Sequence, residues 1–167
     1  MAPRRSHSSG ATRRPVPRPL AEEDLDRVVA IERAAFTDPW SRRSFEELLA
    51  RAHVRGIAVD GDDGALAGYA LVTMVAGEGE ILNLAVAPAA RRRGFGRRLL
   101  DAALDLLRAA GTTSVFLEVR QSNRAAIELY TKAGFQTVSI RRDYYRNPSE
   151  HAVTMSLALA PETARKR

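Results

Sequence analysis

The chain has 167 residues, of which 45% are hydrophobic and 28% are charged. This length and composition are typical of one globular domain, alone or with tails. It has no cysteine, which excludes disulfides, a cysteine nucleophile and thiolate metal sites. Its histidines, His7, His53 and His151, are too scattered to predict a metal site, so we expect no metal.

The net charge of +6 is concentrated at the ends of the chain. Residues 1–19 carry arginines and no acidic residue, together with half of the prolines. We predict a disordered basic tail over residues 1–19, a domain over residues 20–160 and a short basic tail over residues 161–167. Three interpretations of the first tail stay open: a solvated extension, an arm that contacts RNA or the ribosome, and an organelle transit peptide.

The sequence contains neither the apolar segment of a signal peptide nor the roughly 18–20 apolar residues that a membrane helix needs. We therefore expect a cytoplasmic protein that does not enter the membrane. The domain itself is close to neutral, so direct binding of nucleic acid is not expected of it, although the basic tail would allow it.

Two helices and a strand are predicted in the first part of the domain. An apolar stripe of helical period runs from Leu25 to Phe36, after three acidic residues that suit the first turn of a helix. Residues 37–40 (Thr-Asp-Pro-Trp) end this helix, and Ser41 is a suitable cap for a second one. Residues 54–59 then predict a strand.

The middle of the chain predicts a hairpin and a strand–loop–helix unit. Residues 60–64 (Asp-Gly-Asp-Asp-Gly) are typical of a turn between strands, and residues 65–75 and 80–87 read as the strands that follow. Residues 91–96 form a loop with two glycines, and residues 97–110 predict an amphipathic helix.

The last part of the chain predicts a strand (113–120), a helix (122–133) and two further strands (135–140 and 151–159). Together these elements indicate an α/β fold with a mixed sheet of about six to seven strands and about four helices. The order of hairpin, βαβα unit and hairpin is not that of a doubly wound nucleotide-binding fold.

The segment Arg91-Arg92-Arg93-Gly94-Phe95-Gly96 joins a predicted strand to a predicted helix. Unpaired backbone N–H groups and the dipole at such a helix start favour a phosphate, and glycines let the backbone approach it. The segment is neither a P-loop nor a dinucleotide fingerprint, because Leu99 occupies the position of the third glycine. From the residues alone, an anion site and a helix start with solvated arginines stay equally open.

The pattern Arg91-x-x-Gly94-x-Gly96, directly after the strand at residues 82–88, resembles the acetyl-CoA motif of the GNAT acetyltransferase superfamily. The resemblance implies that acetyl-CoA is the co-substrate. It implies that the strand end pairs with the pantetheine arm through Leu84, Ala85 and Val86, one backbone N–H of which would hold the carbonyl oxygen. The loop would bind the pyrophosphate through Arg92, Arg93, Gly94, Phe95, Gly96 and Arg97.

Three further segments, residues 36–41, 116–130 and 140–145, resemble the ribosomal-protein-alanine N-acetyltransferases of bacteria, the RimI type of this superfamily. The similarity runs from about residue 20 to residue 159. It implies direct acetyl transfer to the N-terminal alanine of small-subunit ribosomal protein eighteen. The alternatives are a GNAT enzyme of broader scope, acting on other N-termini, lysines or small amines, and a ribosome- or RNA-binding module.

Glu118 is the candidate general base. Alternation in the predicted strand places it on one face with Phe116 and Arg120. A carboxylate among apolar neighbours would have a raised pKa, which suits a base near neutral pH, whereas a carboxylate paired with an arginine would have only a structural role. The resemblance implies that Glu118 is the proton acceptor.

Tyr130 and Asn123 lie in the predicted helix that follows. A phenol stays protonated at neutral pH and can donate a proton to a thiolate, but the same pattern fits a tyrosine of the core. Either Ser122 or Asn123 can cap the helix. The resemblance implies that Tyr130 is the proton donor and that Asn123 also contacts coenzyme A.

Aromatic residues form the last candidates. By the resemblance, Tyr144 and Tyr145, which we expect between the last two strands, would line the wall for the substrate peptide, although structural packing is nearly as well supported. Trp40 and Phe36 can line the opposite wall or join the first two helices, and we favour the second interpretation.

Overall fold

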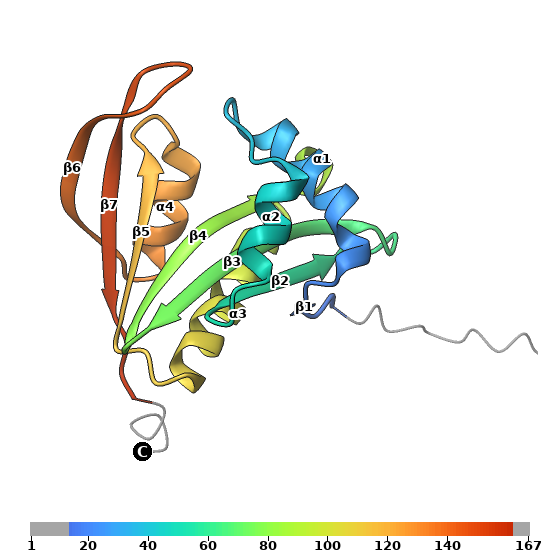
Figure 1. Cartoon of the computed structure of the whole chain (residues 1–167), viewed down its shortest axis with the longest axis horizontal. Coiled ribbons are helices and arrows are strands. Elements are labelled where there is room, and N and C mark those ends of the chain that lie inside the picture. Colours follow the sequence, from blue (N-terminus) through green and yellow to red (C-terminus); the bar gives the residue numbers. More distant parts are fainter. Residues whose placement is uncertain (1–13, 162–167) are drawn as a thin grey trace, which may run out of the picture.

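The computed structural model describes residues 14–161, and its elements form one mixed sheet with helices on both faces (Figure 1). The helices are α1 (Leu25–Ala35), α2 (Arg42–Leu49), α3 (Phe95–Ala109) and α4 (Arg124–Lys132), with 3-10 turns η1 (Glu22–Asp24) and η2 (Pro88–Ala90). The strands are β1 (Arg18–Pro19), β2 (Val54–Asp60), β3 (Leu66–Val75), β4 (Glu78–Val86), β5 (Ser114–Arg120), β6 (Gln136–Tyr145) and β7 (Glu150–Ala158). Their order in the sheet is β1-β2-β3-β4-β5-β7-β6, which confirms the predicted fold class.

Strand alternation divides the core into two layers. Ile57, Val72 and Ile81 point to the face covered by α3 and α4, whereas Tyr69 and Leu71 point to the face covered by α1 and α2. Each layer is apolar because successive residues of a half-buried strand face opposite sides. Phe116 of β5 and Val138 and Ile140 of β6 are large apolar side chains that remain exposed.

The strands β4 and β5 are paired for only part of their length. They are parallel from Glu78, opposite Ser114, to Ile81, opposite Leu117, and then run apart, as Figure 1 shows. On the other side of β4 the register with β3 shifts, so that Leu82 is an extra residue in a bulge. Beyond Ile81, the edge of β4 that faces β5 therefore has no strand partner.

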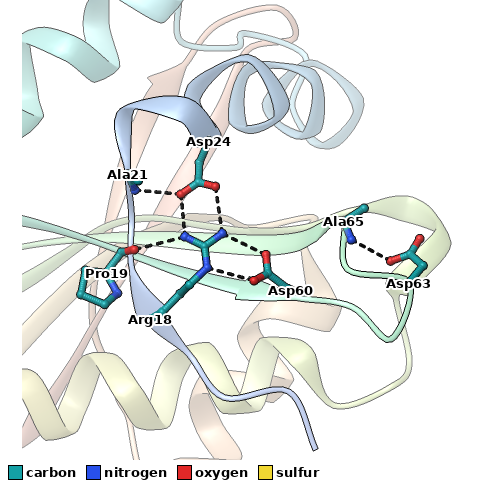
Figure 2. A network of polar contacts seen from close by, with 7 residues as sticks. All are labelled: Arg18, Pro19, Ala21, Asp24, Asp60, Asp63 and Ala65. Carbon is teal, nitrogen blue, oxygen red and sulfur yellow. Dashed lines mark hydrogen bonds and ion pairs between the residues drawn. The ribbon is translucent and has the colours of Figure 1, made fainter.

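The N-terminal boundary of the ordered chain differs from the prediction. Arg18 and Pro19, assigned to the disordered tail, form β1 and pair with β2. Figure 2 shows the reason: the Arg18 guanidinium donates to Asp24 at 2.8 and 2.9 Å and to Asp60 at 2.9 Å. Both carboxylates come from later segments, so local composition does not predict the contact. Residues 1–13 and 162–167 of the predicted tails lie outside the described residues.

The prediction was also wrong about the end of β6, which extends to Tyr145 rather than stopping at Ile140. Tyr144 and Tyr145 therefore belong to the strand and not to the connection before β7. The pairing with β7 is irregular between Arg141 and Tyr145, and Asp143 has a φ of 50°. This irregularity interrupts the alternation that a strand prediction relies on.

Candidate active site

A cleft of about 810 Å³ opens where β4 and β5 run apart. Its walls come from the end of β4, the start of α3, the strand β5, the helix α4 and the loop between α1 and α2. Most of the predicted site residues line it, namely Leu84, Ala85, Val86, Arg92, Gly94, Phe95, Gly96, Glu118, Asn123, Tyr130 and Tyr145. Divergence of two parallel strands in the middle of the sheet is what brings these segments together.

One end of the cleft is a cradle of backbone amides. Arg92 and Gly94 have φ values of 62° and 83°, and α3 begins directly afterwards at Phe95. The first helical hydrogen bond here is from the Arg98 N–H to the Gly94 carbonyl at 3.1 Å. Within residues 14–161, the N–H groups of Phe95 and Gly96 have no such partner and are free for an anion.

The two glycines of this loop differ in backbone conformation and in surroundings. At Gly94 a Cβ would meet no atom within 4 Å, but the positive φ disfavours any other residue. At Gly96 a Cβ would meet only Leu129 and Val86, at 3.5 and 3.8 Å, which is ordinary contact. No neighbouring protein atom excludes a side chain at position 96, so glycine is not needed there for packing. The absence of a side chain leaves space in the cleft for a ligand.

Only some of the arginines of the loop line the cleft. Arg92 lines the cleft as predicted, and so does Arg91, which the prediction left out although it opens the motif. Arg93 and Arg97, which the resemblance also places around the pyrophosphate, are not among the residues that line the cleft. The Arg97 side chain pairs with Asp101 at 3.0 Å, one turn along α3 and away from the loop.

Asn123 caps α4 as predicted, accepting a hydrogen bond from the Ala126 N–H at 3.2 Å. It also lines the cleft opposite the end of β4, so the capping role and a role in ligand binding are compatible. Sequence reasoning missed Glu32 and Asn83, which line the same cleft from α1 and β4. Both lie in segments whose apolar pattern predicts only a buried face.

Glu118 lines the cleft, and of the two surroundings that the sequence left open, apolar neighbours or an arginine partner, the structure shows the arginine partner. Its Oε1 accepts a hydrogen bond from Arg141 Nη1 at 2.6 Å, and the side chain is 21% exposed. Glu80 lies near it on the same face of the sheet, since Glu80 is opposite Phe116 in the parallel register. Burial and the charge of Glu118 raise the pKa of Glu80.

Tyr130 is a buried residue of α4 whose ring packs edge-on against Phe135, with centroids 5.7 Å apart. Burial, and next the proximity of Tyr145, raise the pKa of Tyr130 well above that of a free phenol. The hydroxyl thus stays protonated at physiological pH. Tyr130 is both a core aromatic and a lining residue of the cleft, so the two interpretations of the sequence do not exclude one another.

Of the two tyrosines of β6, one lines the cleft and the other does not. Tyr145 lines the cleft, carries the Arg120 guanidinium over its ring at 4.4 Å, and has its pKa raised to about 12, chiefly by burial. Tyr144 does not line the cleft and is 45% exposed. It packs beneath Arg141, at 4.5 Å, and its interaction with Glu118 raises its pKa.

Trp40 joins the first two helices, as we favoured: its ring lies 5.5 Å from that of Phe45 in α2. Trp40 and Phe36 also line the cleft, so the alternative interpretation describes them equally well.

Residues 14–161 contain neither a metal cluster nor a membrane-spanning helix. No group of three or more histidine, aspartate or glutamate side chains there is arranged to hold a metal ion. Every helix in the same residues is too short or too polar to span a membrane.

Known proteins with this arrangement are acetyltransferases. Residues 25–135 match the model of the acetyltransferase (GNAT) family. The [ribosomal protein bS18]-alanine N-acetyltransferase of Salmonella typhimurium is 36% identical over 140 residues, which are 84% of this chain and 93% of that protein. The N-alpha-acetyltransferase RimI of Mycobacterium tuberculosis is 38% identical over 142 residues, 81% of this chain and 87% of the relative.

Among solved structures, the ribosomal-protein-S18-alanine N-acetyltransferase of Escherichia coli superimposes with a TM-score of 0.80 at 34% identity. The match covers 89% of this chain and 97% of that one. The splayed strands, the glycine-containing loop and these similarities agree, and the chain belongs to the GNAT family of acetyltransferases.

Proposed function

We propose that the chain transfers an acetyl group from acetyl-CoA to the N-terminal α-amino group of a protein, and that its substrate is the N-terminal alanine of ribosomal protein bS18. The observation that carries the proposal is the composition of one cleft. It has an amide cradle for a pyrophosphate at one end, and a carboxylate and a buried phenol on the walls beyond it. The substrate follows from the relatives, two of which are named for bS18.

The cleft fits acetyl-CoA along its length. The free N–H groups of Phe95 and Gly96, with Arg91 and Arg92, would hold the pyrophosphate. The unpaired edge of β4, from Leu84 to Val86, would hydrogen-bond the pantetheine arm as a missing strand would. When bound, acetyl-CoA supplies a thioester whose carbonyl carbon can be attacked by an amine.

Glu118 would accept the proton of the α-ammonium group, directly or through a water. An α-amino group has a reference pKa of about 7.7–8.0, so its deprotonation near neutral pH needs little driving force. A backbone N–H of the β4 edge would hold the carbonyl oxygen while negative charge develops on it. The new C–N bond forms as the C–S bond breaks.

Tyr130 would donate its hydroxyl proton to the sulfur that leaves. The thiol reference pKa is about 8.5, below that of a phenol, so the donor must be close to the sulfur and correctly oriented. Burial in α4 and packing on Phe135 hold the ring in one place. Transfer by this route needs no covalent enzyme intermediate, which agrees with a chain that lacks cysteine.

The test is a panel of short peptides incubated with the protein and acetyl-CoA, with each product read by mass. The panel contains the alanine-starting N-terminus of bS18, the same peptide with a blocked α-amino group, and one with an internal lysine. A gain of one acetyl group on the free N-terminus alone supports the proposal. Acetylation of the lysine peptide, or of no peptide, would overturn it and direct the search to small amines.

A further inference from the structure

Glu32 of α1 is a buried carboxylate, 2% exposed, at the wall of the cleft. Its Oε1 accepts a hydrogen bond from the Trp40 backbone N–H at 3.0 Å, and its Oε2 accepts from Asn83 Nδ2 at 2.8 Å and from the Tyr69 hydroxyl. No lysine or arginine within residues 14–161 pairs with it. A buried charge without a counter-ion is costly unless hydrogen bonds satisfy it, and here three donors do so.

The three donors come from three segments that meet only in the folded chain. Trp40 belongs to the loop after α1, Tyr69 to β3 and Asn83 to β4. Asn83 directly follows Leu82, the extra residue of the β4 bulge, and lies at the start of the edge that has no strand partner. The Glu32 carboxylate therefore anchors β4 at the residue where its edge becomes free for a ligand.

We propose that Glu32 is a positioning residue, which fixes the direction in which the backbone N–H groups of β4 point into the cleft. Through these groups it fixes the position of the carbonyl group that reacts. This inference rests on the proposed function and extends it to a residue that touches no substrate atom. A bulge shifts by one residue at modest cost, and such a slip would turn each N–H of the edge to the other side. The clamp on Asn83 opposes that slip.

The three hydrogen bonds to Glu32 depend on its carboxylate group as well as on the shape of its side chain. Burial and the neighbouring Glu32 carboxylate raise the pKa of Tyr69, which keeps its hydroxyl protonated and able to donate. A glutamine at this position would offer one acceptor oxygen and an NH2 group that faces donors. At least one of the three contacts would then be lost.

The experiment compares Glu32→Gln with Val28→Ala in the full chain. Glu32→Gln is expected to lower kcat about 10–100-fold, as a small misplacement of reacting groups does, and to leave the Kd for coenzyme A within about twofold. Val28 is one turn earlier in the same helix, fully buried and outside the cleft. Its truncation lowers stability by a cavity but removes no hydrogen bond to β4, so kcat measured well below the Tm should stay unchanged.

A double variant that exchanges the carboxylate of Glu32 and the amide of Asn83 distinguishes a positioning role from a general loss of protein stability. Glu32→Gln combined with Asn83→Asp restores an amide–carboxylate hydrogen bond with the roles reversed, and it keeps the acceptor for the Trp40 N–H. The kcat of the double variant is expected to be at least tenfold higher than that of Glu32→Gln alone. A double variant no better than Glu32→Gln alone would argue against the clamp.

Hydrogen exchange of the backbone amides provides a readout without substrate. Glu32→Gln is expected to speed exchange at residues 82–86, whereas Val28→Ala should not do so selectively. Unchanged exchange at these residues together with an unchanged kcat would overturn the inference. If the wild-type protein transfers no acetyl group to any peptide, the proposed function fails instead, and the exchange data alone decide whether Glu32 anchors β4.

Discussion

Arg141 Nη1 lies 2.6 Å from Oε1 of Glu118, so the candidate base is paired with a cation from the neighbouring β6–β7 hairpin. Arg141 is 55% exposed and stacks over Tyr144, whereas Glu118 is 21% exposed and faces the cleft. The pair is therefore exposed to solvent on one side and faces the cleft on the other. An exposed pair of this kind contributes little to stability, which leaves the carboxylate available for another partner.

Replacing Glu118 by Gln is expected to lower kcat about 10²–10⁴-fold, the usual contribution of a general base, with little change in the Kd for coenzyme A. Steady-state kinetics with the bS18 peptide and a separate binding titration check both parts. The matched control is Glu128→Gln, an exposed residue of α4 that pairs with Lys132 and lies outside the cleft. Full activity of the Glu118 variant would remove this residue from the mechanism.

Tyr130→Phe is expected to lower kcat at least tenfold while the protein stays folded, because the ring keeps its packing on Phe135 and only the hydroxyl is lost. Since the pKa of Tyr130 is raised by burial, its protonated form persists beyond pH 10. The wild-type rate should then show no loss from this group between pH 7 and pH 10. A loss in that range that Tyr130→Phe abolishes would show that the hydroxyl ionises earlier than its environment implies.

Gly94→Ala tests the amide cradle. Its φ of 83° makes alanine unfavourable, by about 1 kcal/mol, and a change of the loop backbone would weaken coenzyme A binding at least tenfold. Gly64→Ala is the control, because Gly64 has a φ of 80° and open space around it, in the β2–β3 turn outside the cleft. Both variants should lose similar stability in denaturant unfolding, and only Gly94→Ala should lose affinity. Equal affinity in both would show that the cradle does not bind the co-substrate.

Glu80→Gln tests the electrostatics beside the candidate base. Burial and the charge of Glu118 raise the pKa of Glu80 in the folded state, so the folded protein binds this proton more tightly than the unfolded chain does. Stability from this group is therefore lost as pH rises from the unfolded pKa of about 4.3 through the raised folded pKa. The variant should have a higher Tm than the wild type at pH 7, and the difference should vanish as the pH approaches 4. An equal Tm at pH 7 would contradict the raised pKa.

Arg18→Gln tests the N-terminal contact of Figure 2. Loss of the forked hydrogen bonds to Asp24 and Asp60 is expected to lower the free energy of unfolding by about 1 kcal/mol at pH 7, since the side chain is partly exposed. Hydrogen bonding to Arg18 lowers the pKa of Asp24, so this stabilisation is present above the unfolded pKa and is lost as pH falls through the folded one. Urea unfolding at pH 7 and at pH 3 measures the effect. A difference that does not shrink in acid would contradict the assignment.

Several features were determined by the sequence alone. The apolar periods of α1 and α3, the turn at residues 60–64 and the strand–loop–helix order are local, so they predict the elements and the fold class. The segment from Arg91 to Gly96 predicts a glycine-containing helix start for a local reason too, because its glycines and the helix start are adjacent in the chain, and this leaves an anion site open without deciding it. Asn123 as a helix cap follows from the same kind of local rule.

Other features were decided only by the tertiary structure, because they depend on residues distant in the sequence. The strand alternation places Glu118 on one face with Phe116, but only the β6–β7 hairpin brings Arg141 to it and decides between the apolar surroundings and the arginine partner that the sequence left open. The ordering of Arg18 depends on Asp60, and the anchoring of Asn83 on Glu32. A sequence pattern specifies which side of an element a side chain faces, whereas hydrogen bonds and ion pairs between segments require the distances that folding alone brings about.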